Sequence, residues 1–169
     1  TTLGTNSIRS KIEMSVLLTT KKIIKEWTDY NNHMNLSYYI LVFDLGAEVI
    51  LSKFKMGEQS AKTTKKSTMV VETHTTYNNE VKEGDEVDVF LSHFDHDNKR
   101  LHYKLEMYEK SDNILSATTE VLALYVDLNL RKVAEFEDEK TKIMDEFINQ
   151  NKSNFKSENL HFSNKLKNN

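Results

Sequence analysis

The residues best suited to chemistry lie in one polar segment, 28–35, which reads Thr-Asp-Tyr-Asn-Asn-His-Met-Asn. Asx residues hydrogen-bond to their own backbone and tolerate left-handed conformations, so the segment reads as a loop rather than core. Within it, the Asp29 carboxylate is suited to act on a carbonyl group, either as a base on water or as a nucleophile. From spacing alone, the favoured alternative is structural: Asp29 and Asn35 cap turns and a helix, and His33 packs with hydrogen bonds.

A helix pattern begins where this loop ends, with Asn35 in the N-cap position. Apolar residues then recur at three- and four-residue steps, which predicts one buried stripe. The stripe consists of Leu36, Ile40, Phe43, Ala47, Ile50, Leu51 and Phe54. The first N–H groups of such a helix are unpaired and carry a partial positive charge, so they are placed to hold an oxyanion that develops on a carbonyl beside Asp29.

Strand patterns flank this helix. A short strand is predicted within residues 19–27, and the period changes to two after a polar connection from Lys55 to Lys66. The four later strand candidates are Ser67–Tyr77, Glu86–His96, Lys99–Lys110 and Ile114–Asp127, and an amphipathic helix spans about Glu137–Gln150. The order predicts an α+β fold, in which an antiparallel five-stranded sheet wraps around a long central helix and a second helix follows at the C-terminal end.

Composition excludes several classes of site. The 169 residues include no cysteine, no proline and only four glycines, which excludes disulfides, Cys-ligated zinc, a thiol nucleophile and a glycine-rich phosphate loop. The six histidines are scattered, so no metal site is expected. A net charge of −3 argues against nucleic acid as a partner, and no apolar run is long enough for a membrane span or a signal peptide. A cytoplasmic location is predicted.

Three regions are expected along the chain: an N-terminal extension over 1–18, one domain over 19–150, and a tail over 151–169. The tail holds four lysines and one glutamate, a net charge of +3, and is rich in Asn and Ser. It is therefore predicted to be poorly ordered. The apolar content suffices for one core but leaves the outer face of the sheet unexplained, which suggests that a partner subunit covers it.

The loop and the start of the helix resemble a known family. Trp27-Thr28-Asp29-Tyr30-Asn31-Asn32-His33-Met34-Asn35, followed by Tyr38-Tyr39, is similar to the D-x-x-G-H-x-N loop of hotdog-fold acyl-CoA thioesterases of the 4-hydroxybenzoyl-CoA thioesterase-like group. Within that group, it most resembles the betainyl-CoA thioesterases of carnitine breakdown, whose loop reads W-x-D-Y-N-G-H-M. Fragments at 71–74, 80–85, 99–102 and 115–120 match in the same order, so the resemblance spans residues 19–150. Asn32 replaces the family's glycine, and Asn tolerates positive φ well.

The resemblance implies a thioesterase that needs no metal or redox cofactor. Asp29 takes the place of the family's catalytic acid, and the backbone N–H groups of Leu36 and Ser37 would hold the oxyanion. Asn31, His33 and Asn35 would shape the loop, and direct proton transfer by His33 stays an alternative to a structural role. The family also implies a homodimer or tetramer whose subunits join edge to edge, with active sites at the interface.

The resemblance further suggests how an acyl-CoA substrate is bound. A betainyl group needs aromatic or anionic surroundings, because a quaternary ammonium has no N–H to donate. The candidates for substrate binding are Trp27, Tyr30, Asn31, Tyr38, Tyr39, Glu72 and His74, with core packing or an exposed strand face as the alternatives for the aromatic and strand residues. The candidates for the CoA phosphates are Lys65, Lys66, Lys99 and Arg100, each of which also reads as solvated surface charge.

Two other functions compete with this interpretation. A hotdog-fold hydratase is the nearest rival enzyme, but its D-x-N-P-x-H motif contains a proline and places the acid and histidine five residues apart. Here Asp29 and His33 are four apart. The second alternative is an acyl-CoA-binding protein that keeps the fold without turnover. The complete set of Asp29, His33 and Asn35 argues against that loss.

Overall fold

The computed structural model describes residues 16–167. The strands are β1 (Val16–Lys22), β2 (Lys66–Tyr77), β3 (Glu86–His96), β4 (Arg100–Glu109), β5 (Ile114–Asp127) and β6 (Lys132–Val133). The α-helices are α2 (Leu36–Lys53), α3 (Glu58–Thr64) and α4 (Asp138–Asn151), and the 3-10 helices are η1 (Lys25–Trp27), η2 (Lys152–Asn154) and η3 (Ser163–Lys165).

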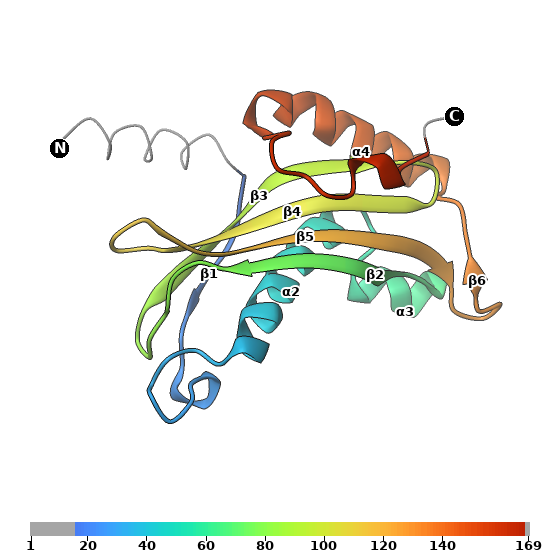
Figure 1. The fold of residues 1–169 in the computed structure, drawn as a ribbon. Coiled ribbons are helices and arrows are strands. Elements are labelled where there is room, and N and C mark those ends of the chain that lie inside the picture. The colour runs from blue at the N-terminus through green and yellow to red at the C-terminus, as the bar shows by residue number, and fades with distance from the viewer. Residues whose placement is uncertain (1–15, 168–169) are drawn as a thin grey trace.

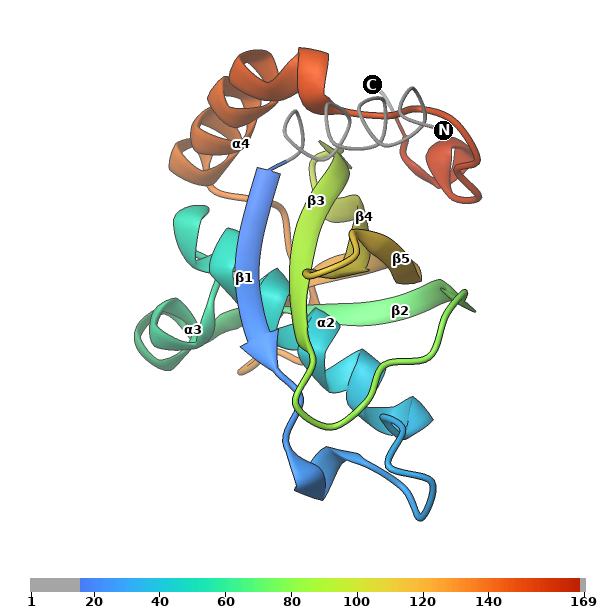
Figure 2. The ribbon, with the colours of Figure 1, turned by 90° about the vertical axis from the view of Figure 1, so that its left-hand side faces the viewer.

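The long strands form one antiparallel sheet in the order β1-β3-β4-β5-β2, and the two-residue β6 pairs with β5. This sheet curls around α2, as Figures 1 and 2 show from two sides. The arrangement confirms the predicted α+β architecture. β2 forms one edge of the sheet, and β5 lies inside it between β4 and β2, as its apolar residues on both faces predict.

Element boundaries agree with the sequence patterns within one residue, except that α3 forms within the predicted polar connection and that the first strand is shifted. β3 and β5 have the predicted bounds, whereas β1 begins at Val16 and ends at Lys22 instead of spanning 19–27. The apolar residues that suggested a later strand have other roles, since Ile23 is a buried core residue beyond the strand end and Trp27 closes η1. β1 therefore overlaps the predicted N-terminal extension, of which residues 1–15 lie outside the described residues.

The helix α2 packs on the sheet with a face that matches the predicted stripe in part: Phe43, Ala47 and Ile50 are buried as predicted, and so is Phe54 just beyond the helix. Its buried residues are Tyr39, Val42, Phe43, Gly46, Ala47 and Ile50. Leu36 and Ile40, which the periodicity assigned to the core, are 60% and 45% exposed. The close contact forms around Gly46, where an added Cβ would lie 2.9 Å from Cγ1 of Val89 on β3. The helix thus leans towards the β1–β3 side, which leaves Leu36 and Ile40 without cover.

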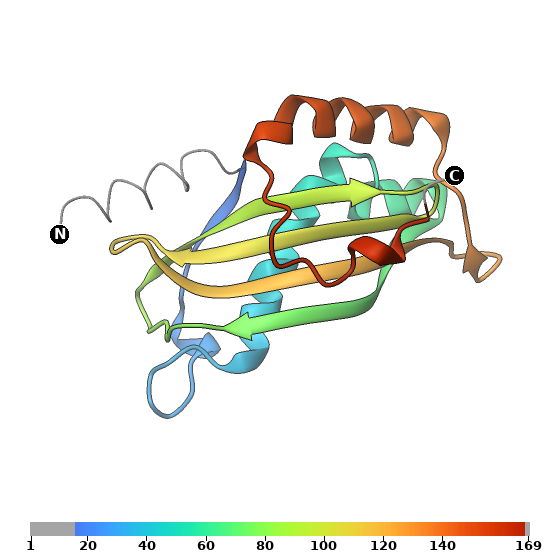
Figure 3. The same cartoon turned by 45° about the horizontal axis from the view of Figure 1, so that its top comes forward.

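The C-terminal segment differs from its predicted disorder. Phe147 of α4 packs edge-on against Phe54 and Phe94 of the core. Beyond α4, residues 152–167 cross the outer face of the sheet (Figure 3). The chain's own C-terminal segment therefore covers part of the face that the sequence assigned to a partner subunit.

Aromatic packing and polar bonds both hold this segment. Phe162 is buried, and Phe155 packs against Phe147. The Lys156 N–H donates to the Ser92 carbonyl at 2.8 Å, and the Lys167 N–H donates to Asp97 Oδ2 at 3.0 Å. The Glu120 carboxylate, from β5, accepts the N–H groups of both His161 and Phe162 at 2.8 Å. Composition gives no sign of such bonds, which explains why the sequence predicted a poorly ordered tail.

No helix within residues 16–167 combines the length and apolar character needed to cross a bilayer.

Candidate active site

The loop before α2 is a tight hairpin. The Asp29 N–H donates to the His33 carbonyl at 2.9 Å, and the Asn35 N–H donates to the Trp27 carbonyl at 2.9 Å. At its tip the Asn31 N–H donates to Asp29 Oδ1 at 2.8 Å, and the Asn32 N–H donates to the Asp29 carbonyl at 3.0 Å. Asn32 has φ of 60°, which confirms that Asn supplies the left-handed position where the related family has glycine.

This hairpin is fixed to a second segment of the chain, residues 81–83. The Met34 N–H donates to the Val81 carbonyl at 2.7 Å, and the Glu83 N–H donates to the Asn32 carbonyl at 3.1 Å. Met34 is buried beneath the loop. The loop therefore has backbone support on both sides, which holds the half-buried Asp29 in one place.

Asn35 is the N-cap of α2, as predicted. Its backbone is extended, and its Oδ1 accepts the Ser37 N–H at 3.0 Å. This bond changes the predicted oxyanion site, because the cap side chain already occupies one of the two N–H groups expected to hold the oxyanion. The Leu36 N–H has no acceptor among the described residues. In this state, Leu36 alone of the two offers an unpaired donor.

His33 sits in the hairpin with its ring directed at an acidic neighbour. Its Nδ1 lies 3.4 Å from Oε1 of Glu80, and its side chain is 30% exposed. This contact gives the imidazole a positioning partner, in keeping with the structural role weighed above. Glu80 belongs to a fragment that matched the related family, but nothing in its spacing marked it as a partner of His33.

The four aromatic candidates do not form one enclosure within the subunit. Trp27 and Tyr38 stack with ring centroids 6.1 Å apart. Tyr39 instead lies in the core, edge-on to Tyr77, where burial raises the pKa of its hydroxyl. Tyr30 is 93% exposed at the loop tip. Only the Trp27–Tyr38 pair therefore offers adjacent aromatic surface beside the loop.

Glu72 and His74 share a face of β2, as their spacing predicts, and it is the outer face. They pair with Leu122 and Glu120 of β5, and the His74 ring stacks on the ring of His161 in the C-terminal segment, with the two ring centroids 3.8 Å apart. Thr73, between them, faces α2. Within one subunit, Glu72 and His74 thus lie on the side of the sheet opposite α2, and their role in substrate binding stays a prediction.

The basic candidates lie far from Asp29, and two of the four, Lys66 and Arg100, form ion pairs elsewhere. Lys66 begins β2, whose 12 residues span roughly 40 Å, whereas the Asp29 loop lies beyond the other end of that strand. Arg100 Nη1 donates to Asp97 Oδ2 at 2.9 Å, and the adjacent Lys99 donates its N–H to Asp97 Oδ1. Lys65 ends α3 in a left-handed conformation, with φ of 57°. One subunit alone does not bring these residues to the Asp29 loop.

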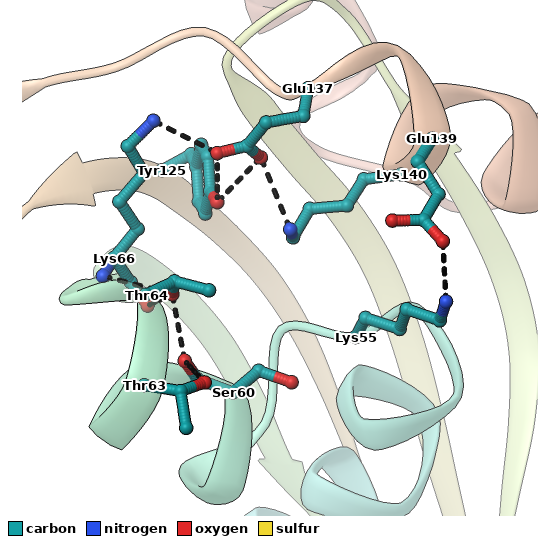
Figure 4. Close-up of polar contacts among 9 residues, drawn as sticks. All are labelled: Lys55, Ser60, Thr63, Thr64, Lys66, Tyr125, Glu137, Glu139 and Lys140. Atoms are coloured by element: carbon teal, nitrogen blue, oxygen red, sulfur yellow. Dashed lines mark hydrogen bonds and ion pairs between the residues drawn. The ribbon is translucent and has the colours of Figure 1, made fainter.

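Lys66 in particular belongs to a polar cluster around Glu137 (Figure 4). The Glu137 carboxylate lies 2.9 Å from Lys66 Nζ and 3.2 Å from Lys140 Nζ, and it accepts the Tyr125 hydroxyl at 2.8 Å. Partial burial opposes ionisation of this carboxyl, but the Lys66 and Tyr125 donors outweigh it and hold its pKa at about 2. These contacts tie the start of β2 to the start of α4, so Lys66 has a structural task.

Comparison with known proteins now decides the family. The family model of the thioesterase-like superfamily matches residues 24–147. The chain belongs to this superfamily. It is 33% identical over 128 residues to the betainyl-CoA thioesterase of Pseudomonas aeruginosa, an alignment that covers 75% of this chain and 80% of that relative. As a member of the superfamily, the protein is a thioester hydrolase.

Solved structures confirm the hotdog fold of this thioesterase-like chain. A Staphylococcus aureus protein in complex with CoA superposes with a TM-score of 0.74 at 24% identity, over 92% of this chain and 96% of the other. A 1,4-dihydroxy-2-naphthoyl-CoA thioesterase from Synechocystis superposes with a TM-score of 0.66 at 15% identity, over 75% and 93% of the two chains. The antiparallel sheet curled around α2 is therefore the hotdog arrangement that the loop motif implied.

Proposed function

We propose that this protein hydrolyses a small or medium acyl-CoA to the free acid and CoA, with betainyl-CoA as the leading substrate. One arrangement carries the proposal: the half-buried Asp29 lies in a hairpin that leads directly into α2, where the Leu36 N–H lacks an acceptor among the described residues. A carboxylate and an unpaired helix donor are the two groups that thioester hydrolysis requires. The P. aeruginosa relative supports the choice of acyl group.

In the reaction, Asp29 accepts a proton from water as the oxygen attacks the thioester carbonyl carbon. The carbonyl oxygen becomes an oxyanion, which the Leu36 N–H and the positive end of α2 stabilise. Collapse of this intermediate breaks the carbon–sulfur bond, and the CoA thiolate leaves and takes up a proton. Direct attack by Asp29, through an acyl-enzyme anhydride that water then hydrolyses, uses the same groups and stays an alternative.

A hydrolysis panel tests the substrate. We expect thiol release from betainyl-CoA with a higher kcat/KM than from acetyl-, benzoyl- or long-chain acyl-CoA, measured with a colorimetric thiol reagent. Equal rates on all four thioesters, or no rate on betainyl-CoA, would remove the betainyl assignment. Tight CoA binding without any thiol release would instead identify a binding protein, and hydration of an enoyl-CoA would identify a hydratase.

We also propose a homodimer that forms through β2. This edge strand exposes a run of apolar side chains, with Met69, Val70 and Val71 at 44%, 55% and 52% exposure. An unprotected apolar edge is a template for pairing with another strand. Light scattering on the purified chain should give twice the chain mass of 19.7 kDa, or four times if dimers pair. A mass of one chain at micromolar concentration would contradict this proposal.

Such a dimer would bring two of the distant basic candidates near a second active site. If two copies of β2 pair antiparallel about a twofold axis, the Lys66 end of one strand meets the Tyr77 end of the other, which leads to the segment that supports the Asp29 loop. Lys65 and Lys66 would then approach the site of the second copy, where CoA phosphates need positive charge.

The cytoplasmic location stays a prediction, which cell fractionation tests.

A further inference from the structure

A cavity of about 190 Å³ lies between α2 and the inner face of β2, β4 and β5. Its walls are mainly apolar and aromatic. They include Phe43 and Ala47 from the helix, and Val70, Tyr103 and Val121 from the strands. Asp44, an exposed residue of α2, lines the same space, and among the described residues around the cavity it carries the only charge. We call this space the Asp44 pocket.

The Asp44 carboxylate has no hydrogen-bond or ion-pair partner among residues 16–167. Its charge nevertheless acts on the pocket wall, since burial, and secondarily the Asp44 charge, raise the pKa of the Tyr103 hydroxyl. An unpaired carboxylate beside apolar and aromatic walls favours a cation that carries apolar groups. A quaternary ammonium fits this description, because it has no N–H that would be left unsatisfied and is attracted to ring faces and carboxylates.

The pocket also lies in line with the proposed reaction centre. Leu36, Ile40 and Asp44 are spaced by four residues, so they share one face of α2. Asp44 is eight residues beyond the Leu36 N–H, roughly 12 Å along the helix axis, and its side chain leans back towards the N-terminus. An acyl group whose carbonyl meets the Leu36 N–H therefore extends along this face towards Asp44.

We propose that the Asp44 pocket receives the acyl group and that Asp44 selects acyl groups which carry a positive charge. This inference rests on the proposed thioesterase function. The cation of a betainyl group is only two bonds from the carbonyl carbon, about 2.5 Å, whereas a cation four bonds away reaches about 5 Å. Because Coulomb attraction grows as the charges approach, the preference for a cationic acyl group should be larger for the longer chain.

Two isosteric substrate pairs test this selection. Betainyl-CoA is compared with 3,3-dimethylbutanoyl-CoA, and 4-(trimethylammonio)butanoyl-CoA with 5,5-dimethylhexanoyl-CoA; each pair differs only by nitrogen against carbon. We expect the native enzyme to prefer the cationic member of each pair in kcat/KM, and more strongly in the longer pair. Asp44→Asn should lower this cationic-to-neutral ratio by about threefold in the longer pair, since water screens the charge of an exposed carboxylate. Since each ratio is taken within one variant, a general loss of activity cancels.

The matched control is Asp112→Asn, which removes the same charge from an exposed hairpin turn outside the pocket. It should keep both ratios of the native enzyme. Ratios that stay unchanged in Asp44→Asn, or native ratios near one, would overturn the role of Asp44 while leaving the thioesterase function intact. Absence of thiol release from these four substrates alone would overturn the proposed selection, whereas absence of release from acetyl-, benzoyl- and long-chain acyl-CoA as well would overturn the thioesterase function.

Discussion

Asp29→Asn is expected to lower kcat for acyl-CoA hydrolysis by about a thousandfold. The amide neither accepts a proton from water nor attacks the carbonyl carbon, so both routes open to Asp29 are lost. The oxyanion donor is unaffected, because the Leu36 N–H belongs to the backbone. Steady-state thiol release on the best thioester of the panel measures the effect. The dissociation constant for CoA should stay close to that of the native protein.

Asparagine is the informative substitution because of what Asp29 does in the loop. Its Oδ1 accepts the Asn31 N–H at 2.8 Å, and that bond helps to set the turn that contains Asn32. An amide oxygen accepts the same bond, so Asp29→Asn removes the base and preserves the turn. Asp29→Ala would remove both and would confuse lost chemistry with a changed loop.

The control for this experiment is Glu26→Gln, which removes an exposed carboxylate three residues earlier in η1. It should hydrolyse the thioester at nearly the native rate. Native activity in Asp29→Asn would show that another group activates water. Hydrolysis in ¹⁸O-labelled water separates the two routes, since only the anhydride route can place the label in the Asp29 carboxylate.

The fold was predictable from sequence where the signal is local. The bounds of β3 and β5 follow from strand-forming runs that end at the turn residues Asp97-Asn98 and begin after Asp112-Asn113, and the Asx-rich loop with its Asn35 cap follows from short-range backbone chemistry. Which side of a helix is buried depends on neighbours that are distant in sequence. Leu36 and Ile40 fit the apolar stripe as well as Phe43 does, but α2 leans towards β3 at Gly46 and leaves them exposed.

In the candidate site, too, the sequence predicted contacts between neighbours in the chain but not those that depend on the three-dimensional arrangement. The loop residues were brought together as expected, because they are neighbours in the chain. An acid between apolar helix positions predicts a solvent-facing side chain, and Asp44 is exposed. The sequence gives no sign that this exposed carboxylate also lines a pocket. The sequence also did not show that two acceptors would compete for the Ser37 N–H. This group was expected to hold an oxyanion, but it donates to the side chain of the Asn35 cap. The helix α3 was missed because its seven residues carry no apolar stripe.

Glu120→Gln is expected to lower the free energy of unfolding at pH 7 by about 3 kcal/mol. The native carboxylate is 1% exposed and lies 2.7 Å from Nε2 of the equally buried His102. It also accepts the N–H groups of His161 and Phe162 at 2.8 Å. The amide of glutamine turns one acceptor into a donor, so it opposes an N–H group that cannot turn away. Urea unfolding followed by tryptophan fluorescence measures the loss.

The same substitution should loosen the C-terminal segment. Two of the backbone bonds that hold residues 152–167 on the sheet end at Glu120. Hydrogen exchange at His161 and Phe162 should therefore be faster in Glu120→Gln than in the native protein. Glu146→Gln, on an exposed position of α4, is the control and should change the free energy of unfolding by less than about 0.5 kcal/mol.

The pH dependence of the free energy of unfolding tests whether the charge of Glu120 is responsible. Burial raises the pKa of Glu120, but the N–H groups of His161 and Phe162 and the His102 bond outweigh it and leave the pKa below its usual range. A carboxyl group whose pKa is depressed by folding stabilises the native state above its unfolded pKa of about 4.3, and the stabilisation is lost as the pH falls through the folded value. The stability difference between the native protein and Glu120→Gln should therefore be full at pH 7 and shrink below about pH 4. A difference that stays constant to pH 3 would show that the cost comes from packing and not from the charge of Glu120.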